Sequence, residues 1–402
     1  MSNTILTIDQ ITREALRLAH EKATFIGTIN RQFDESFANS GGKIGDTLRI
    51  RYPSEYTRRT GSRVMDVQES VQTSTSLVVA TQDGVDMRFN SREMSLDLDN
   101  FSKLHLEPAM ATLISNIDSD VLQGCTKSTY NWGGTSGFAI SSLTAPGEAR
   151  TRLNRNLAPK GDRRLQVNSA VMQSLVSGTA AYFNPSGAIS EQYREGLVAR
   201  TAMADYYENE RVWSMANTTT VTLSTAKLNG YISTNGQTSL NITSLATTTV
   251  GIGMKFSIGN VLEVHPETKQ SYGVLKQFTV TGVTDASTFT ISPPIFRTGA
   301  RQNVTGIGVT TSTQALTWLG SPNSTYALGL MYHKDAFTFA TADLPLMADA
   351  AKCVRKTYDG ISLRVWQASD IRNDELLTRI DILYGFAAIR PAWASVVIGA
   401  SD

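Results

Sequence analysis

The sequence predicts an α+β fold that is interrupted by an inserted all-β domain. Residues 7–38 and 106–124 carry apolar side chains spaced three and four apart, which is typical of long amphipathic helices. Segments of alternating apolar and polar residues surround them and are typical of strands. Residues 217–310 differ in composition, because 28 of them are Ser or Thr and only nine are charged. This change indicates a second folding unit inside the first.

The N-terminal segment is predicted to be a helix with an apolar stripe. The stripe begins at Ile8 and Ile11, and Gly41-Gly42 supplies the stop. Four larger side chains continue it: Phe25, Ile29, Phe33 and Phe37. Such a stripe needs a cover. Two interpretations stay open: packing within the chain, or an arm that lies on a neighbouring subunit.

The next segment is predicted to contain two strands around a basic excursion. The stretch "GDTLRIRYP" alternates and ends at Pro53, and alternation resumes from Val71 to Val79. Between them lie three arginines with hardly any apolar anchors: Arg58, Arg59 and Arg63. Further on, Asp83-Gly84 predicts a tight turn that folds "LVVATQ" against "VDMRFNS".

The second long helix and the C-terminal segment complete the pattern. Met110, Leu113, Ile117 and Val121 share one helix face. The last segment, "RIDILYGFAAIRPAWASVVIGASD", is strongly apolar and must be covered. Proline lacks an N–H group, so Pro391 is expected at a strand edge, end or bulge. The three apolar residues beyond it are expected to pack inward: Val396, Val397 and Ile398.

No segment carries the residues of a known catalytic, cofactor or metal site. There is no GxxxxGK[ST] sequence, and His105-Leu106-Glu107 lacks the PCxxC sequence that a zinc deaminase requires. Asp118 and Asp120 lie two apart on a helix and therefore point in different directions. The sequence predicts no enzyme, no cofactor and no metal. An enzyme whose site is assembled from separated residues stays the rival interpretation.

Charge and hydropathy exclude further classes of protein. The chain has 37 basic and 36 acidic side chains, whereas a domain that neutralises phosphates is strongly basic. No run of 18 apolar residues occurs, and no signal peptide is visible. We therefore expect neither sequence-specific binding of nucleic acid nor a membrane partner.

Two C-terminal segments resemble a known family. "LGLMYHKDAFTFATADLP" and "RIDILYGFAAIRPAWASVVIG" are similar to the closing region of major capsid proteins of tailed bacteriophages. The likeness is greatest to the coat-protein family of the short-tailed Salmonella phages, whose C-terminus has the form R-I-x-x-L/W-Y-G-x-x-x-x-R-P. This form is matched by Arg379, Ile380, Tyr384, Gly385, Arg390 and Pro391. Upstream, "EQYREGLVARTAMADYYENERV" resembles the segment before that family's inserted β-barrel.

The resemblance implies the Hong Kong 97-type capsid fold. Its expected parts are an N-terminal arm at 1–42, an extended loop hairpin at 43–98, a peripheral domain with a spine helix at 99–135 and 341–402, an axial domain at 136–213 and 311–340, and an inserted β-barrel at 214–310. The terminal strand is then expected in the peripheral sheet, under the spine helix.

The function implied is that of a major capsid protein. Copies would assemble through pentamers and hexamers into an icosahedral shell that encloses phage double-stranded DNA, with a scaffolding protein and a portal as further partners. Assembly would occur in the bacterial host cytoplasm, and the final location would be the virion capsid. Inter-subunit contacts are expected at Arg58, Arg59, Arg63, Phe25, Ile29, Phe33 and Phe37. The alternative is an exported surface or appendage protein with a glycan-binding β domain.

Overall fold

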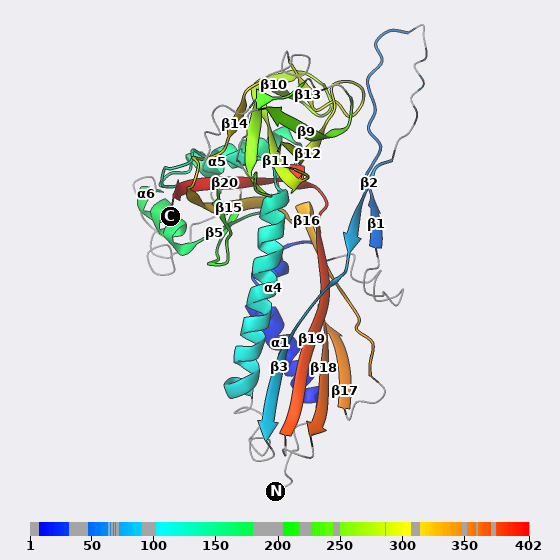
Figure 1. Cartoon of the computed structure of the whole chain (residues 1–402), viewed down its shortest axis with the longest axis vertical. Helices are drawn as coiled ribbons and strands as arrows, with labels where there is room; N and C mark the ends of the chain where they lie inside the picture. Colours follow the sequence, from blue (N-terminus) through cyan, green and yellow to red (C-terminus); the bar gives the residue numbers. More distant parts are fainter. Residues whose placement is uncertain are drawn as a thin grey trace. The chain divides into compact units, whose positions relative to one another are not determined.

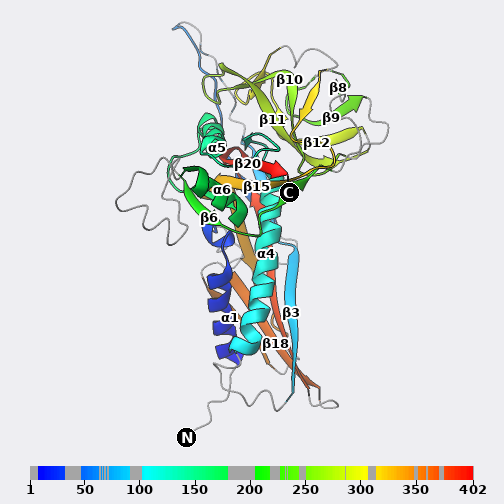
Figure 2. The ribbon, with the colours of Figure 1, turned by 90° about the vertical axis from the view of Figure 1, so that its left-hand side faces the viewer.

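The computed structural model describes residues 8–31, 47–62, 65, 67, 69, 72–90, 102–179, 204–217, 227–230, 232, 234–243, 250–285, 287–306, 314–347, 352–358, 361–370 and 375–401 (Figures 1 and 2). The chain forms two compact units. Unit 1 comprises Met1–Ile50, Ser74–Val121 and Phe337–Ile389, and unit 2 comprises Arg51–Thr73, Leu122–Ala336 and Arg390–Asp402. Within the described part, no helix is long and apolar enough to span a membrane.

Unit 1 is built on a five-stranded antiparallel sheet (Figure 1). Its central strand β19 (Glu375–Ala388) pairs with β18 (Ile361–Asp370), which pairs with β17 (Lys352–Tyr358). The strands β3 (Thr81–Asn90) and β16 (Phe337–Ala342) also pair with β19. Helix α1 (Ile8–Lys22) contacts β17 and β18, and buries Ile11, Ala15 and Leu18. The apolar stripe of α1 is therefore covered within the chain.

The long helix α4 (Glu107–Ser128) follows a short π-helical segment at Ser102–Leu106. Its first part belongs to unit 1, where all four residues of the predicted stripe are buried: Met110, Leu113, Ile117 and Val121. Lys22 of α1 pairs with Glu107 at 3.2 Å, so the two helices lie side by side (Figure 2). The predicted spine helix is present and extends four residues further than expected.

The predicted arm helix is wrong between Lys22 and Arg31, where the described residues continue. A short 3-10 helix at Ile26–Thr28 follows, and Phe25 and Ile29 lie outside α1. The reason is Asp118, whose carboxylate accepts the backbone N–H groups of Phe25 and Ile26 and so replaces the bonds that would continue the helix. Phe33 and Phe37 lie outside the described residues.

The predicted tight turn at Asp83-Gly84 is also wrong. Strand β3 runs through both residues without a turn, and Gly84 lies opposite Asp381 of β19. A Cβ atom at Gly84 would lie 2.5 Å from the Asp381 carboxylate and 2.8 Å from the Ile380 carbonyl oxygen. Glycine is needed here for a close approach between strands, not for a turn.

Two short strands form the predicted extended hairpin. β1 (Thr47–Arg51) and β2 (Ser74–Val78) pair in a two-stranded sheet. Arg49 Nε donates to Ser74 Oγ at 2.7 Å across the pair. The intervening residues 52–73 form the basic excursion of the hairpin.

Unit 2 contains a six-stranded mixed sheet. Strand β15 (Thr325–His333) pairs with β20 (Ala394–Ser401), β5 (Arg163–Val167) and β7 (Ser214–Ala216). Two short parallel pairings add β4 (Trp132–Gly133) beside β20 and β6 (Asp205–Glu208) beside β5. Helix α5 (Thr144–Arg155) packs on the sheet through Ala149 and Leu153, and α6 (Ser169–Thr179) adds Met172 and Leu175 to the same core.

The C-terminal strand confirms one prediction and corrects another. Val396, Val397 and Ile398 are buried, and Pro391 opens a 3-10 turn (Pro391–Trp393) between β19 and β20. The strand does not belong to the sheet of β17–β19, however. It pairs with β15 and β4 in unit 2, because the turn at Pro391 ends β19 and lets the chain enter a second sheet.

The segment between β7 and β15 forms a seven-stranded antiparallel sheet in unit 2. Its strands are β8 (Lys227–Leu228), β9 (Gln237–Thr243), β10 (Lys255–Val264), β11 (Ser271–Val283), β12 (Thr288–Ile295), β13 (Val304–Thr305) and β14 (Leu316–Trp318). Phe256 stacks on Phe278 and contacts Phe289 and Trp318 in its core. An isolated bridge joins Lys227 to Ala315, next to β14. Separate folding of this segment stays a prediction.

Candidate assembly surface

The excursion of the extended hairpin presents basic and apolar side chains to solvent. Arg58 and Arg59 are exposed, and Arg63 lies outside the described residues. Three large apolar side chains accompany them, with exposed fractions of 60% for Tyr56, 82% for Met65 and 79% for Val67. Tyr, Met and Arg are enriched in the buried centres of protein interfaces. The excursion therefore has the composition of a contact surface.

The base of the hairpin is anchored, in contrast to its excursion. Leu77 and Val79 are fully buried in unit 1. The backbone of Val78 and Val79 passes over Gly385 of β19 so closely that a Cβ atom at Gly385 would overlap the Val78 carbonyl oxygen. Beyond the base, the Tyr52 N–H donates to the Thr73 carbonyl at 2.8 Å, which continues the strand pairing into the excursion. The base of the hairpin is therefore held to β19 within unit 1.

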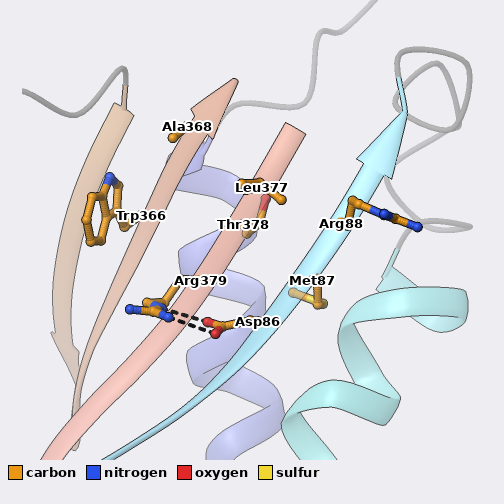
Figure 3. Close-up of a pocket in the computed structure, with 8 residues that line it drawn as sticks. All are labelled: Asp86, Met87, Arg88, Trp366, Ala368, Leu377, Thr378 and Arg379. Atoms are coloured by element: carbon orange, nitrogen blue, oxygen red, sulfur yellow. Dashed lines mark hydrogen bonds and ion pairs between the residues drawn. The ribbon is translucent and has the colours of Figure 1, made fainter. Parts of the chain in front are cut away.

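A second candidate surface lies on the sheet of unit 1, on the face opposite α1 (Figure 3). It is an open groove of about 420 Å³, lined by Asp86, Met87, Arg88, Trp366, Ala368, Leu377, Thr378 and Arg379. The Leu377 side chain in it is 47% exposed. The Trp366 indole N–H is buried and has no hydrogen-bond partner among the described residues. The exposed apolar surface of Leu377, and not the buried indole N–H, is what favours contact with another polypeptide.

One ion pair orders the charged side of this groove. Arg379 Nε and a terminal nitrogen of its guanidinium donate to the two Asp86 oxygens at 2.7 and 2.8 Å (Figure 3). The hydrogen bond from Arg379 lowers the pKa of Asp86, and the pair in turn raises the pKa of Arg379. Both groups stay charged at neutral pH, so neither is suited to acid–base chemistry.

The remaining titratable groups of interest are structural. Arg364 and Asp381 form a buried pair at 2.6 Å in unit 1. In unit 2, the buried carboxylate of Glu263 accepts Lys276 at 3.0 Å and Arg152 at 3.1 Å. Across the described ranges, no group of three His, Cys, Asp or Glu side chains is arranged to hold a metal ion.

Phe25 and Ile29 do not belong to an exposed surface. Both are almost completely buried in unit 1, and the Phe25 ring lies 6.3 Å from the Phe337 ring. A side chain covered by its own chain has no area left for a neighbour, so the structure corrects the expected inter-subunit contact at these two residues. The sequence analysis in turn missed Tyr56, Met65 and Val67. Their signal was present as isolated apolar residues in a polar stretch.

The comparison with protein families gives a match in the second half of the chain. Residues 207–399 match the family model described as "P22 coat protein - gene protein 5". This part of the chain is therefore similar to a bacteriophage coat protein. Membership in the particular family of the short-tailed Salmonella phages stays a prediction, and a search of curated proteins found no match.

Solved structures are similar to this chain over most of its length. A structure from Mycobacterium phage Che8 is 10% identical, with a TM-score of 0.50, and the alignment covers 93% of this chain and 90% of that chain. The capsid structure of the cyanophage P-SCSP1u is 11% identical, with a TM-score of 0.44 and coverage of 89% and 84%. The mature capsid of bacteriophage PhiM1 is 9% identical, with a TM-score of 0.41 and coverage of 87% and 81%. The predicted Hong Kong 97-type α+β fold is confirmed.

Proposed function

We propose that this chain is a major capsid protein of a tailed bacteriophage, whose copies associate through pentamers and hexamers and close into an icosahedral shell around phage double-stranded DNA. The single observation that carries the proposal is the match of residues 207–399 to the P22 coat protein model. Rings of five and six copies require head-to-tail contacts, in which one surface of a subunit meets a different surface of the next. The protein makes no covalent chemistry in this role, and we infer no enzymatic activity.

The extended hairpin is proposed as one half of such a head-to-tail contact. Arg58, Arg59 and Arg63 would pair with carboxylates of an adjacent subunit. The exposed apolar groups of Tyr56, Met65 and Val67 support this role, because they gain most from being covered. A contact of this kind between obligate partners buries on the order of 2,000 Å² or more.

The enclosed DNA is proposed to be held without sequence-specific binding. The chain carries 37 basic and 36 acidic side chains, so the wall of the shell has little net attraction for phosphates. Small counterions would then neutralise most of the packaged genome.

Further partners follow from the family resemblance. We propose a scaffolding protein and a portal as assembly partners, and assembly in the cytoplasm of the bacterial host. We also propose that the peripheral and axial domains have the boundaries predicted from the sequence, except for the C-terminal strand. The inserted β segment is proposed to stabilise the subunit and its contacts with neighbours.

Electron microscopy of the purified chain, expressed alone and together with the scaffolding protein of the same phage, tests the proposal. Closed hollow particles of uniform diameter are expected. A chain that stays monomeric with and without that scaffolding protein, under every salt and crowding condition, would contradict it.

A further inference from the structure

The C-terminal end of α4 has backbone carbonyl groups that need hydrogen-bond donors from outside the helix. The last four carbonyls of any α-helix have no partner within the helix. Here the Thr129 hydroxyl satisfies the Cys125 carbonyl, whereas the hydroxyl groups of Thr126 and Ser128 donate to carbonyls one turn earlier, at Leu122 and Gly124. Thr126 and Thr129 are buried within unit 2 and Lys127 is half-buried. The Thr126 carbonyl accepts the Thr129 N–H at 3.3 Å, and the further donors to these three carbonyls come from outside the helix.

The donors come from one cross-strand pair of the inserted β segment. Lys255 of β10 donates through Nζ to the Thr126 carbonyl at 3.1 Å and also to the Thr129 carbonyl. Thr279 of β11 donates through Oγ1 to the Lys127 carbonyl at 3.0 Å. Lys255 and Thr279 lie directly opposite each other in the β10–β11 register. One position of the strand pair therefore caps the end of the helix.

The same face of β11 continues the contact. Gln277 lies two residues before Thr279 and therefore points to the same side of the strand. Its side-chain amide donates to the Trp132 carbonyl at 3.1 Å and accepts the Trp132 N–H at 2.9 Å. This exchange of two hydrogen bonds imitates a strand pairing. The chain that leaves α4 is thus held to the inserted segment at two consecutive places.

The burial of these polar residues shows that this face of the strand pair is covered within unit 2. Lys255, Gln277 and Thr279 are all buried, although polar residues that alternate with core residues on a strand normally face solvent. The Nζ of Lys255 lies at the negative end of the helix dipole, which offsets part of the cost of burying its charge. A buried ammonium group without these hydrogen-bond acceptors would be strongly unfavourable.

We propose that the β10–β11 strand pair of the inserted segment is the C-terminal cap of α4, with Lys255 and Thr279 as the capping residues. The last turn of α4 and the inserted segment then become ordered together and act as one conformational unit. The inserted segment therefore stabilises the C-terminal end of α4. The inference does not depend on the proposed course of shell assembly.

Hydrogen exchange of the unassembled full-length chain, followed by mass spectrometry, tests the proposal. The variants are Lys255→Met, which keeps the length of the side chain without a donor, and Thr279→Val, which keeps its shape. Lys352→Met is the matched control, because Lys352 is an exposed lysine of β17 in unit 1. We compare amides of residues 121–131 with amides of β12, which lies in the same inserted segment but does not contact α4 through these donors.

Exchange of residues 121–131 is expected to increase at least about tenfold in Lys255→Met, since hydrogen bonds from a charged donor are worth about 1.4 kcal/mol or more, and by a smaller factor in Thr279→Val, whose hydroxyl is neutral. Amides of β12 should change less, and the control should leave both regions unchanged. Unchanged exchange of residues 121–131 in both variants would overturn the proposal. So would an equal increase in all regions of Lys255→Met with no effect of Thr279→Val, because this shows only a general loss of stability. If Lys255→Met does not fold, Thr279→Val decides alone.

Discussion

The Asp118 carboxylate of α4 accepts the backbone N–H of Phe25 at 3.0 Å. The same oxygen accepts the Ile26 N–H at 2.9 Å, and the other oxygen accepts the Thr24 hydroxyl at 2.9 Å. One buried side chain thereby ends α1, starts the next turn and holds Phe25 against the core.

Replacing Asp118 by Ala is predicted to destabilise unit 1. Two buried amide donors would lose their acceptor, and each costs about 1–3 kcal/mol when unpaired. Urea unfolding of the unassembled chain measures the loss. Asp120→Asn is the control, since Asp120 lies two residues further on the same helix and is exposed. Equal stability of Asp118→Ala and the wild type would show that these hydrogen bonds are not important.

Gly385 is predicted to tolerate no side chain. In Gly385→Ala the new methyl group would overlap the Val78 carbonyl, so the base of the extended hairpin must move away from β19. Overpacking of this kind typically costs about 1–3 kcal/mol. Thermal unfolding, together with limited proteolysis of the hairpin, measures the effect. Gly27→Ala is the control in the same unit, because its Cβ atom would meet nothing within 4 Å. Similar results for the two variants would be evidence against the anchoring role.

Lys255 predicts a specific dependence of stability on pH. Burial lowers its pKa from 10.5 to about 7. The groups that accept hydrogen bonds from its Nζ are the backbone carbonyls of Thr126 and Thr129. Between these two values the unfolded chain binds more protons at this residue than the folded chain. The free energy of unfolding contributed by Lys255 therefore rises with pH through this window, by at most about 1.4 kcal/mol per unit, and is constant below it.

The comparison of the wild type with Lys255→Met isolates this contribution. Urea unfolding from about pH 6 to pH 10 should show a difference between the two proteins that grows with pH in favour of the wild type. A difference that is independent of pH would mean that Lys255 keeps an ordinary pKa in the folded chain.

The basic residues of the hairpin are predicted to matter for assembly and not for folding. The double variant Arg58→Glu and Arg59→Glu reverses two exposed charges and should prevent shell formation, because like charges would meet at the proposed contact. Its circular dichroism and unfolding midpoint should match the wild type. The charge-preserving variant Arg58→Lys and Arg59→Lys should still assemble. Normal shells from the Glu variant would refute the role of these residues.

The sequence was informative where local periodicity and burial agree. The stripe of Met110, Leu113 and Ile117 predicted α4 correctly, because these side chains pack on one face of a continuous helix. The stripe of the N-terminal segment was just as regular, yet the helix ends at Lys22. The cause is Asp118, more than 90 residues away, and no local pattern indicates it.

Contacts between strands that are far apart in the sequence could not be predicted from local patterns either. Gly84 resembles a turn residue, and only its pairing opposite Asp381 shows why a glycine is needed. The inward packing of Val397 was predictable from its apolar neighbours, but its sheet depends on β15 and β4.

The candidate surfaces also include one feature that the sequence predicted and one that it did not. Charge alone predicted that Arg58 and Arg59 are exposed. In contrast, Lys255 alternates with the core residues Met254 and Phe256, a pattern that places a lysine in solvent. Lys255 is buried because the end of α4 packs against it. An alternating strand pattern gives no indication of a helix from another part of the chain.

Cryo-electron microscopy of the assembled particle tests the central claim most directly, since it shows which surfaces of neighbouring copies touch. We predict a closed shell with icosahedral symmetry, in which residues 52–73 of each copy lie on an adjacent copy. Particles in which this hairpin contacts only its own subunit, or a chain that forms no closed particle, would contradict the account.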